Sequence, residues 1–357
     1  MKDGYSEAIF AQSIDTLESL GVSTDSFVSQ FGLGALLKRR SFLRTVPLSV
    51  GLKLWDFAYQ ETGDPHVALK SAAQAKFGVL PLVDYLTASS RSPVQALKLF
   101  TLSARRFSDS LDVSYNDLDE SSILNLSFAP SQSVIEDTQL NEECIKRSIA
   151  LINEYTFANI LRVLDYSTVA ELPVEKIQFR HDCYGKKKDY AKYFSAPVEF
   201  SSHNNCIHFF PRINEMKNQV PNVYMYSVLI KELFHRQDCI GADELVIQIQ
   251  EIVRANLNCR ENLMSFVLGQ LSQTGKALTV RTLQRTLAQR GMTFEKIVLE
   301  IKIEESCRLL RERDLTNEEI ATVLGFSNGS SFSRFFRRYI GLSPSEFTPL
   351  EAFQKFD

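Results

Sequence analysis

The sequence lacks the features that would send a protein into or across a membrane. No apolar run approaches the length of about 18 residues that a transmembrane helix needs, and no basic start is followed by an apolar stretch. The six cysteines, at positions 144, 183, 206, 239, 259 and 307, have no CxxC spacing. Scattered, unpaired thiols are typical of a reducing cytosol. We therefore expect a cytoplasmic protein with no membrane partner.

The residue patterns that would indicate an enzyme or a metal site are weak. His203, Cys206 and His208 are close in the sequence, but on a strand only Cys206 and His208 share a face, and no fourth ligand is evident. His181 and Cys183 lie two residues apart at a strand end, without a third residue to orient the imidazole. We expect no catalysis, no cofactor and no metal.

The charge distribution is uneven along the chain. The stretch from Lys276 to Phe347 carries 12 Lys and Arg against 9 Asp and Glu, whereas Met1 to Gly275 carries 27 against 32. A modestly basic segment therefore follows an acidic one, and we expect its acidic residues to face away from an anionic partner such as DNA. Charge alone does not identify a nucleic-acid-binding protein here.

The most informative motif runs from Leu315 to Phe347. Thr316 and Glu319 have the spacing of a capping box, and Ala321 is the small residue expected where two helices cross. Gly325 can take the positive φ that ends the first helix, and Phe326 fills the turn. This order predicts two short helices joined by a tight turn.

The second helix of the motif begins at Ser327 or Asn328 and has two chemically different faces. Its apolar face consists of Phe332, Phe335 and Phe336. Small polar residues stand near the start of the other face and arginines farther along, which is typical of a helix-turn-helix recognition helix. These polar and basic residues are Ser330, Ser331, Arg334, Arg337 and Arg338.

The wording of this motif, including Gly325-Phe326-Ser327 and Gly341-Leu342-Ser343-Pro344, resembles the signature of AraC/XylS bacterial transcription regulators. Such proteins carry two helix-turn-helix units joined by a long helix. The stretch from Thr279 to Leu287 looks like the first recognition helix, and Phe294 to Arg313, free of Gly and Pro, suits the linking helix.

The first unit departs from the family pattern. Phe266 to Leu271 would be the helix before the first recognition helix, but seven residues, Ser272 to Leu278, intervene before Thr279. Either the turn carries an insertion, or the helix continues and Lys276 takes an apolar position. Both alternatives stay open from the sequence.

The resemblance and the helix geometry together assign DNA contacts. Asn328, Ser330, Ser331 and Arg334 are expected at base edges, and Arg334 can pair with guanine. Arg337, Arg338, Ser327 and Thr316 are expected at phosphates. In the first unit, the family implies contacts by Arg281, Gln284 and Arg285, with Thr279 as the cap. Two such helices would enter successive major grooves about 34 Å apart.

The preceding two hundred residues predict an α+β domain. Helices are expected over 6–20, 24–31 and 141–164, and after the capping pairs Asp64-Pro65 and Ser92-Pro93. Trp55 is expected in the core. Alternating apolar residues predict strands over 111–115, 123–128, 176–181 and 207–210.

This region resembles the arabinose-binding-like N-terminal domain of one branch of the AraC class. The matching pieces are Leu20-Gly21-Val22, Trp55, Thr62-Gly63-Asp64-Pro65, Phe77-Gly78, Tyr85-Leu86, Ala96-Leu97, Pro173, Ile177-Gln178-Phe179, 193–200 and Asn205. The resemblance implies a sensory or oligomerisation domain, and the label does not itself indicate arabinose.

The predicted architecture is an α+β N-terminal sensory domain followed by an all-α DNA-binding domain with two helix-turn-helix units joined by a linking helix. The predicted boundaries are 1–215 for the effector-sensing and oligomerisation domain, 216–240 for a connector and 241–350 for the DNA-binding domain. The resemblance implies a bacterial regulator, with an activator as our expectation. Its implied partners are promoter double-stranded DNA, a small-molecule effector, RNA polymerase and a second copy in a homodimer.

Two other interpretations remain open from the sequence. The chain could be a ligand-binding or protein-interaction module with a weakened DNA-binding domain, and the residues inserted before Thr279 favour this alternative. It could also be an enzyme fused to a DNA reader, but that requires a nucleophile, a base and an orienting residue that we do not find.

Overall fold

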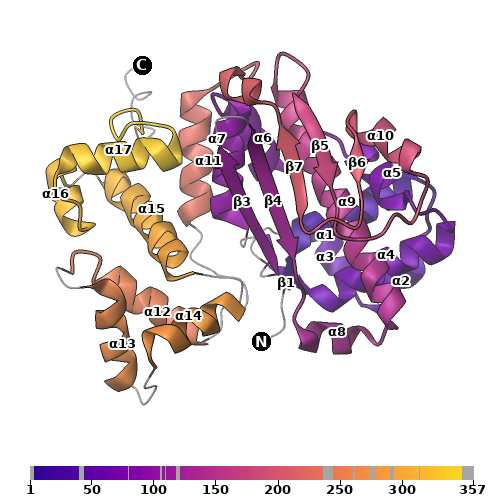
Figure 1. Ribbon diagram of the computed structural model, residues 1–357, viewed down its shortest axis with the longest axis horizontal. Helices are drawn as coiled ribbons and strands as arrows, with labels where there is room; N and C mark the ends of the chain where they lie inside the picture. Colours follow the sequence, from indigo (N-terminus) through magenta and orange to yellow (C-terminus); the bar gives the residue numbers. More distant parts are fainter. Residues whose placement is uncertain are drawn as a thin grey trace. The chain divides into compact units, whose positions relative to one another are not determined.

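The chain forms two compact units in a computed structural model (Figure 1). The structure describes residues 4–39, 44–78, 80–104, 107–108, 110–117, 121–235, 244–259, 262–273, 278–289, 293–312 and 314–347. The N-terminal unit extends to Asn222, and the C-terminal unit begins at Val223. No helix within the described ranges combines the length and apolar composition needed to cross a bilayer.

A five-stranded sheet in the order β3-β4-β7-β5-β6 forms the centre of the N-terminal unit. Neighbouring strands are antiparallel except for β5 and β6, which are parallel. A separate antiparallel pair joins β1 and β2. The strand bounds are β1 Gly4–Ser6, β2 Thr45–Pro47, β3 Leu111–Asp117, β4 Ser122–Phe128, β5 Val174–Gln178, β6 Val198–Glu199 and β7 Asn205–Phe209.

A layer of helices packs against this sheet, with α7 against β3 and α9 against β4. The longest of them, α9, also packs against α4, α5 and α6, and so lies at the centre of the helical layer (Figure 1). The helix bounds are α1 Glu7–Ser19, α2 Asp25–Gln30, α3 Gly34–Arg39, α4 Leu48–Thr62, α5 Val67–Gln74, α6 Pro81–Ser89, α7 Pro93–Ser103, α8 Gln132–Thr138, α9 Glu142–Ser167 and α10 Lys187–Phe194, with a short 3-10 helix at Pro211–Glu215.

The main elements predicted for this unit are confirmed. The four predicted strands correspond to β3, β4, β5 and β7, and the long predicted helix is α9, which Asn141 caps by accepting the Cys144 N–H over 2.8 Å. Ser92 caps α7 as predicted, by accepting the Gln95 N–H. Trp55 is buried at 1% exposure and lies against Tyr155 in the core.

The predicted start of α5 is wrong by two residues. Asp64 accepts the backbone N–H of His66 over 2.9 Å and pairs with Lys70, so it stabilises the turn before the helix. The helix itself begins at Val67 after His66. Strands β1, β2 and β6 are only two or three residues long and were not predicted from the sequence.

The described secondary structure of the C-terminal unit is entirely helical. α15 is its longest helix and contacts α11, α12 and α17. The bounds are α11 Val223–His235, α12 Glu244–Ala255, α13 Leu263–Gln273, α14 Val280–Gln289, α15 Phe294–Glu312, α16 Asn317–Val323 and α17 Gly329–Ile340.

Helix α11 lies within the stretch predicted as a connector, and it belongs to the C-terminal unit. Tyr226, Ile230 and Leu233 are buried at 2% exposure or less. The Tyr226 hydroxyl donates a hydrogen bond to the carbonyl oxygen of Ile340, at the end of α17, over 2.9 Å. This helix therefore contributes to the core that supports α17.

Candidate nucleic-acid interface

A capping box starts the second helix-turn-helix unit, formed by α16 and α17. The Thr316 hydroxyl accepts the Glu319 N–H over 3.3 Å, and the Glu319 carboxylate accepts the Thr316 N–H over 2.7 Å. These bonds satisfy two N–H groups that lack intrahelical acceptors. The bonds that the Thr316 N–H and the Thr316 hydroxyl donate to the Glu319 carboxylate lower the pKa of Glu319. The start predicted from the sequence is confirmed.

The turn between α16 and α17 depends on two glycines and a small crossing residue. Gly325 has a φ of 73°, in the left-handed region predicted for it. Ala321 is fully buried at the crossing of the two helices. The Gly329 N–H donates to the Glu318 carboxylate over 2.8 Å, and a β-carbon at Gly329 would lie 2.7 Å from the same oxygen. The start of α17 is therefore held tightly against α16.

Helix α17 is strongly two-faced. Phe332, Phe336 and Ile340 are fully buried, whereas Phe335 is half-buried and lies against Phe326 with ring centroids 4.8 Å apart. The opposite face follows the three- and four-residue spacing of a helix surface. Its exposed members are Ser330, Arg334, Arg337 and Arg338.

Asn328 has a structural role in addition to its predicted contact with bases. Its Oδ1 oxygen accepts the Ser331 N–H over 2.9 Å and the Ser331 hydroxyl over 3.0 Å, so Asn328 is the N-cap of α17. The capping bonds use the side-chain oxygen. The amide nitrogen of this exposed side chain is therefore the group suited to donate a hydrogen bond to DNA.

In the described ion pairs of the C-terminal unit, the acidic side chains bind arginines outside α14 and α17, with one exception. Arg254 of α12 bonds Glu304 and Glu305 of α15 over 2.9 and 2.7 Å. Arg308 bonds Glu305 and Glu312, each within 2.8 Å. The exception is Glu346, which lies 3.8 Å from Arg337. Within the described part of the chain, Arg334 makes no ion pair, and its guanidinium faces solvent.

The first helix-turn-helix unit, formed by α13 and α14, presents a similar face. Thr279 caps α14 as predicted, accepting the Thr282 N–H over 3.1 Å. Leu283 and Leu287 are fully buried. The residues assigned to DNA, Arg281, Gln284 and Arg285, are all exposed.

The connection between α13 and α14 lies partly outside the described residues. Helix α13 extends two residues beyond Leu271 to Gln273, and α14 begins at Val280. Residues 274–277, including Lys276, are not described, so both alternatives drawn from the sequence stay open.

Helix α15 connects the two helix-turn-helix units as the sequence predicts (Figure 1). Ile297, Ile301, Ile303 and Leu309 are buried along it, and the predicted residue Leu310 is half-buried. Lys302 of α15 lies 4.4 Å from the centre of the Phe326 ring, so the linking helix also contacts the turn of the second unit.

Cys206 and His208 of the N-terminal unit, which the sequence placed in a weak metal-site pattern, make ordinary side-chain contacts. Cys206 and His208 share a face of β7, where both contact the Gln178 side-chain oxygen, at 3.2 and 2.9 Å. Within the described ranges, no group of three His, Cys, Asp or Glu side chains is placed to hold a metal ion.

A buried polar cluster in the N-terminal unit was not predicted. Glu154 of α9 is fully buried and lies 3.6 Å from His181. Burial raises the pKa of Glu154 to about 8. Burial lowers the pKa of His181. At neutral pH the carboxyl and the imidazole are therefore mainly uncharged.

Comparison with known families agrees with this arrangement. Residues 21–218 match the sequence model of the arabinose-binding domain of AraC transcription regulators, and residues 276–349 match that of a helix-turn-helix domain. The first match alone covers more than half of the chain. The chain belongs to the AraC family of transcription regulators. The resemblance inferred from the sequence is confirmed in both halves.

Curated relatives match this AraC-family chain over a short region. An uncharacterized HTH-type transcriptional regulator of Mycobacterium tuberculosis is 38% identical over 68 residues, 19% of this chain and 20% of the relative. The HTH-type transcriptional regulator VqsM of Pseudomonas aeruginosa is 37% identical over 67 residues, 19% of this chain and 21% of the relative. The match thus spans about a fifth of the length of these relatives.

A solved structure is similar over nearly the whole length. The transcriptional regulator CdpR from Pseudomonas aeruginosa has a TM-score of 0.46 and 16% sequence identity, with 95% of this chain and 97% of that chain covered. At this level of similarity, the assignment of residues to a function depends on the geometry described above.

Proposed function

We propose that this protein is a sequence-specific DNA-binding transcription regulator controlled by a small molecule bound in its N-terminal unit. The observation that supports the proposal most strongly is the exposed face of α17, where Ser330, Arg334, Arg337 and Arg338 stand opposite a buried apolar face. Exposed guanidinium groups on a helix suit the acceptors of guanine and phosphate in a major groove.

On α17, the residues nearest the start read bases and those farther along hold phosphates. Arg334 and Ser330 are proposed at base edges, together with the amide nitrogen of Asn328 and the Ser331 hydroxyl. Arg337 and Arg338 are proposed at the backbone, since they lie one turn farther from the helix start. Arg281, Gln284 and Arg285 of α14 have the corresponding role in the first unit.

The remaining assignments follow from the family. We place the protein in the cytoplasm, where promoter DNA is accessible, and propose that it acts there as an activator that contacts RNA polymerase. A homodimer formed through the N-terminal unit would increase occupancy of paired sites by raising the effective concentration of the second DNA-binding domain.

A footprint of the full-length protein on fragments of its native genome tests the proposal. We expect protection of two adjacent major-groove segments on one face of the DNA. Arg334→Ala should reduce protection of one segment and Arg281→Ala protection of the other. Arg212→Ala, which removes an exposed arginine from the N-terminal unit, is the matched control and should leave the footprint unchanged.

The same footprint separates the proposal from the alternative of a weakened DNA-binding domain. The sequence places additional residues before Thr279, so the presentation of α14 is the step most open to failure. Protection of a single segment that is insensitive to Arg281→Ala would mean that only the second unit reads DNA. A full chain that protects no sequence would favour a ligand-binding or protein-interaction module.

A further inference from the structure

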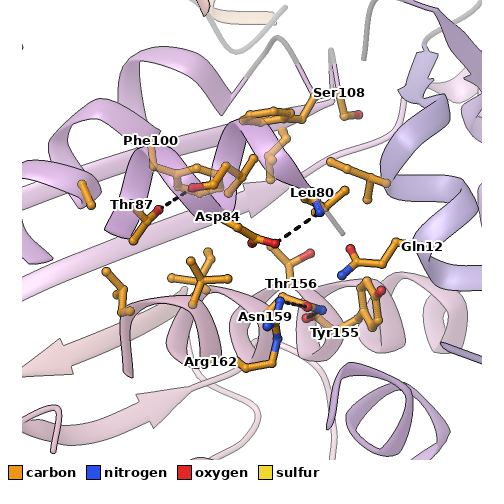
Figure 2. A pocket seen from close by; sticks show the side chains of 18 of the residues that line it. Gln12, Leu80, Asp84, Thr87, Phe100, Ser108, Tyr155, Thr156, Asn159 and Arg162 are labelled. Carbon is orange, nitrogen blue, oxygen red and sulfur yellow. Dashed lines mark hydrogen bonds between the residues drawn. The ribbon is translucent and has the colours of Figure 1, made fainter. Parts of the chain in front are cut away.

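The N-terminal unit contains a cavity of about 110 Å³ between α1, α6, α7 and α9 (Figure 2). Its wall is almost entirely apolar, with Leu97, Phe100 and Ile152 among the lining residues. An apolar cavity of roughly 150 Å³ holds a molecule the size of benzene. At about 110 Å³, the space suits the buried part of a compact ligand, and that part is somewhat smaller than benzene.

Several polar side chains interrupt this apolar wall, and three of them come from three different helices. They are Gln12 of α1, Asp84 of α6 and Arg162 of α9. Gln12 is 1% exposed and Asp84 is fully buried. Figure 2 shows Asp84 facing the α9 side chains Thr156 and Asn159, with Gln12 at the α1 side of the same space.

These side chains contain buried atoms with no hydrogen-bond partner among the described residues. They are both polar atoms of the Gln12 amide, the Oδ1 oxygen of Asp84 and the Nε nitrogen of Arg162. A buried polar atom left without a partner costs about 1–3 kcal/mol, so such atoms are rare unless another group satisfies them. The hydroxyl of Tyr155, another lining residue, is a fifth such atom, and five of them around one cavity indicate a built binding site.

Asp84 is held in place by its other oxygen. Its Oδ2 accepts the backbone N–H groups of Gly78 and Leu80 over 2.8 and 3.2 Å. Burial raises the pKa of Asp84, while the Gly78 N–H and the positive charge of Arg162 oppose the shift. One carboxyl group and one guanidinium group therefore share the site.

We propose that this cavity is the effector site of the N-terminal unit and that it takes a small neutral molecule with a compact apolar body and one amide-like head group. The head must donate to Asp84 Oδ1 and accept from the Gln12 amide nitrogen or Arg162 Nε. A carboxylate ligand would face Asp84, and an ammonium ligand would face Arg162, so a charged head gains no net attraction. This inference deepens the proposed function and depends on its ligand-controlled part.

Three probes of nearly identical shape test the chemistry on the full-length protein. Isobutyramide donates and accepts, 3-methyl-2-butanone only accepts, and isobutyrate is charged. Affinities are measured by ligand-observed NMR titration in the absence of DNA. We expect isobutyramide to bind at least about fivefold more tightly than the other two probes. Only isobutyramide can both donate a hydrogen bond to Asp84 Oδ1 and accept one from the Gln12 amide nitrogen or Arg162 Nε.

Asp84→Asn is the decisive variant, because the asparagine oxygen can keep the bonds to Gly78 and Leu80 while its NH2 group replaces the acceptor Oδ1. We expect this variant to lose the preference for isobutyramide and to bind isobutyrate more tightly than the natural protein does. Asp165→Asn, at an exposed position of α9, is the matched control and should change neither affinity. Ala96→Leu should block all three probes by filling the cavity.

Melting curves without probe show whether each variant is folded. The proposal would be overturned if none of the three probes bound the natural protein. It would also be overturned if the Asp84→Asn and Ala96→Leu variants bound the probes as the natural protein does. Either result would leave water as the partner of these atoms. DNA binding is measured separately by the footprint, so failure of the proposed regulator function and failure of this site give different results.

Discussion

The Tyr226 hydroxyl of α11 bonds the carbonyl oxygen of Ile340, the last residue of the second recognition helix, over 2.9 Å. Tyr226 is 1% exposed and Ile340 is fully buried, so the bond is shielded from water. A helix from the stretch predicted as a connector thus stabilises the end of a helix proposed to bind DNA. This relationship bears on how the DNA-binding domain should be isolated.

A fragment that begins at Asn222 should be more stable than one that begins at Gly241. The shorter fragment lacks α11 and exposes the surface that Tyr226, Ile230 and Leu233 cover. Burial of one such apolar side chain contributes about 1.5–3 kcal/mol. Urea unfolding monitored by circular dichroism measures the difference, and equal midpoints for the two fragments would show that α11 is not part of the domain.

In the longer fragment, Tyr226→Phe should lower the free energy of unfolding by about 1 kcal/mol, since it removes one buried hydrogen bond. Tyr224→Phe is the control, because Tyr224 is exposed on the same helix at 39%. An equal loss from both substitutions would mean that the bond to Ile340 has no special importance.

Gly325→Ala should destabilise the C-terminal unit. The φ of 73° costs a non-glycine residue about 1–2 kcal/mol, and the new β-carbon would also overlap the carbonyl oxygen of Leu257. We therefore expect a loss above about 2 kcal/mol, together with weaker DNA binding. Thermal unfolding of the full chain and titration with its DNA site measure the two effects.

Gly269→Ala is the matched control for this substitution. Gly269 lies inside α13, and an added β-carbon would meet no atom within 4 Å. Alanine should therefore stabilise the helix by about 0.5–1 kcal/mol. If both alanine variants were equally stable, the close approach of Gly325 to Leu257 would not be a constraint on the fold.

Glu154 should contribute a stability that is lost as pH rises from about 5 to about 8. Burial raises the pKa of Glu154 from 4.5 to about 8, so in this range the native state holds a proton that the unfolded chain has released. Glu154→Gln imitates the neutral carboxyl and should flatten this part of the profile. Melting temperatures measured across the range provide the test.

Glu143→Gln, at an exposed position of the same helix, is the control and should leave the profile unchanged. The buried His181 acts in the opposite direction: burial lowers its pKa, so it reduces stability as pH falls below about 6.5 in every variant. A profile for Glu154→Gln that matches the natural protein between pH 5 and 8 would contradict the neutral state of Glu154.

The second helix-turn-helix unit could be predicted from the sequence because its signals are local. The capping pair of Thr316 and Glu319, the turn at Gly325 and the faces of α17 all arise within one or two helical turns. The structure adds a second role for Asn328. Its side-chain oxygen caps α17, and its amide nitrogen is the group proposed to contact DNA. Sequence spacing alone does not distinguish these roles.

The ligand cavity could not be predicted in this way. Gln12, Asp84 and Arg162 are separated by more than seventy residues at each step and meet only through the packing of α1, α6 and α9. Strand β6 was missed for a similar reason, since its two residues carry no periodic signal and pair with β5 only in the folded unit. Burial of Glu154 likewise depends on tertiary contacts.

Competition between DNA sites tests the central claim most directly. Full-length protein, Arg334→Ala and Arg337→Ala are titrated against the footprinted site, against versions with single base-pair changes, and at several salt concentrations. Arg334→Ala should lose about 1–3 kcal/mol on the natural site and become indifferent to one base pair.

Arg337→Ala should weaken binding to all sequences alike and reduce the slope of log affinity against log salt by roughly one, as expected for a lost phosphate contact. That pair of results is what recognition by α17 predicts. If the two variants relaxed specificity equally, or if neither changed the affinity for any site, the proposal that α17 reads DNA through Arg334 would be contradicted.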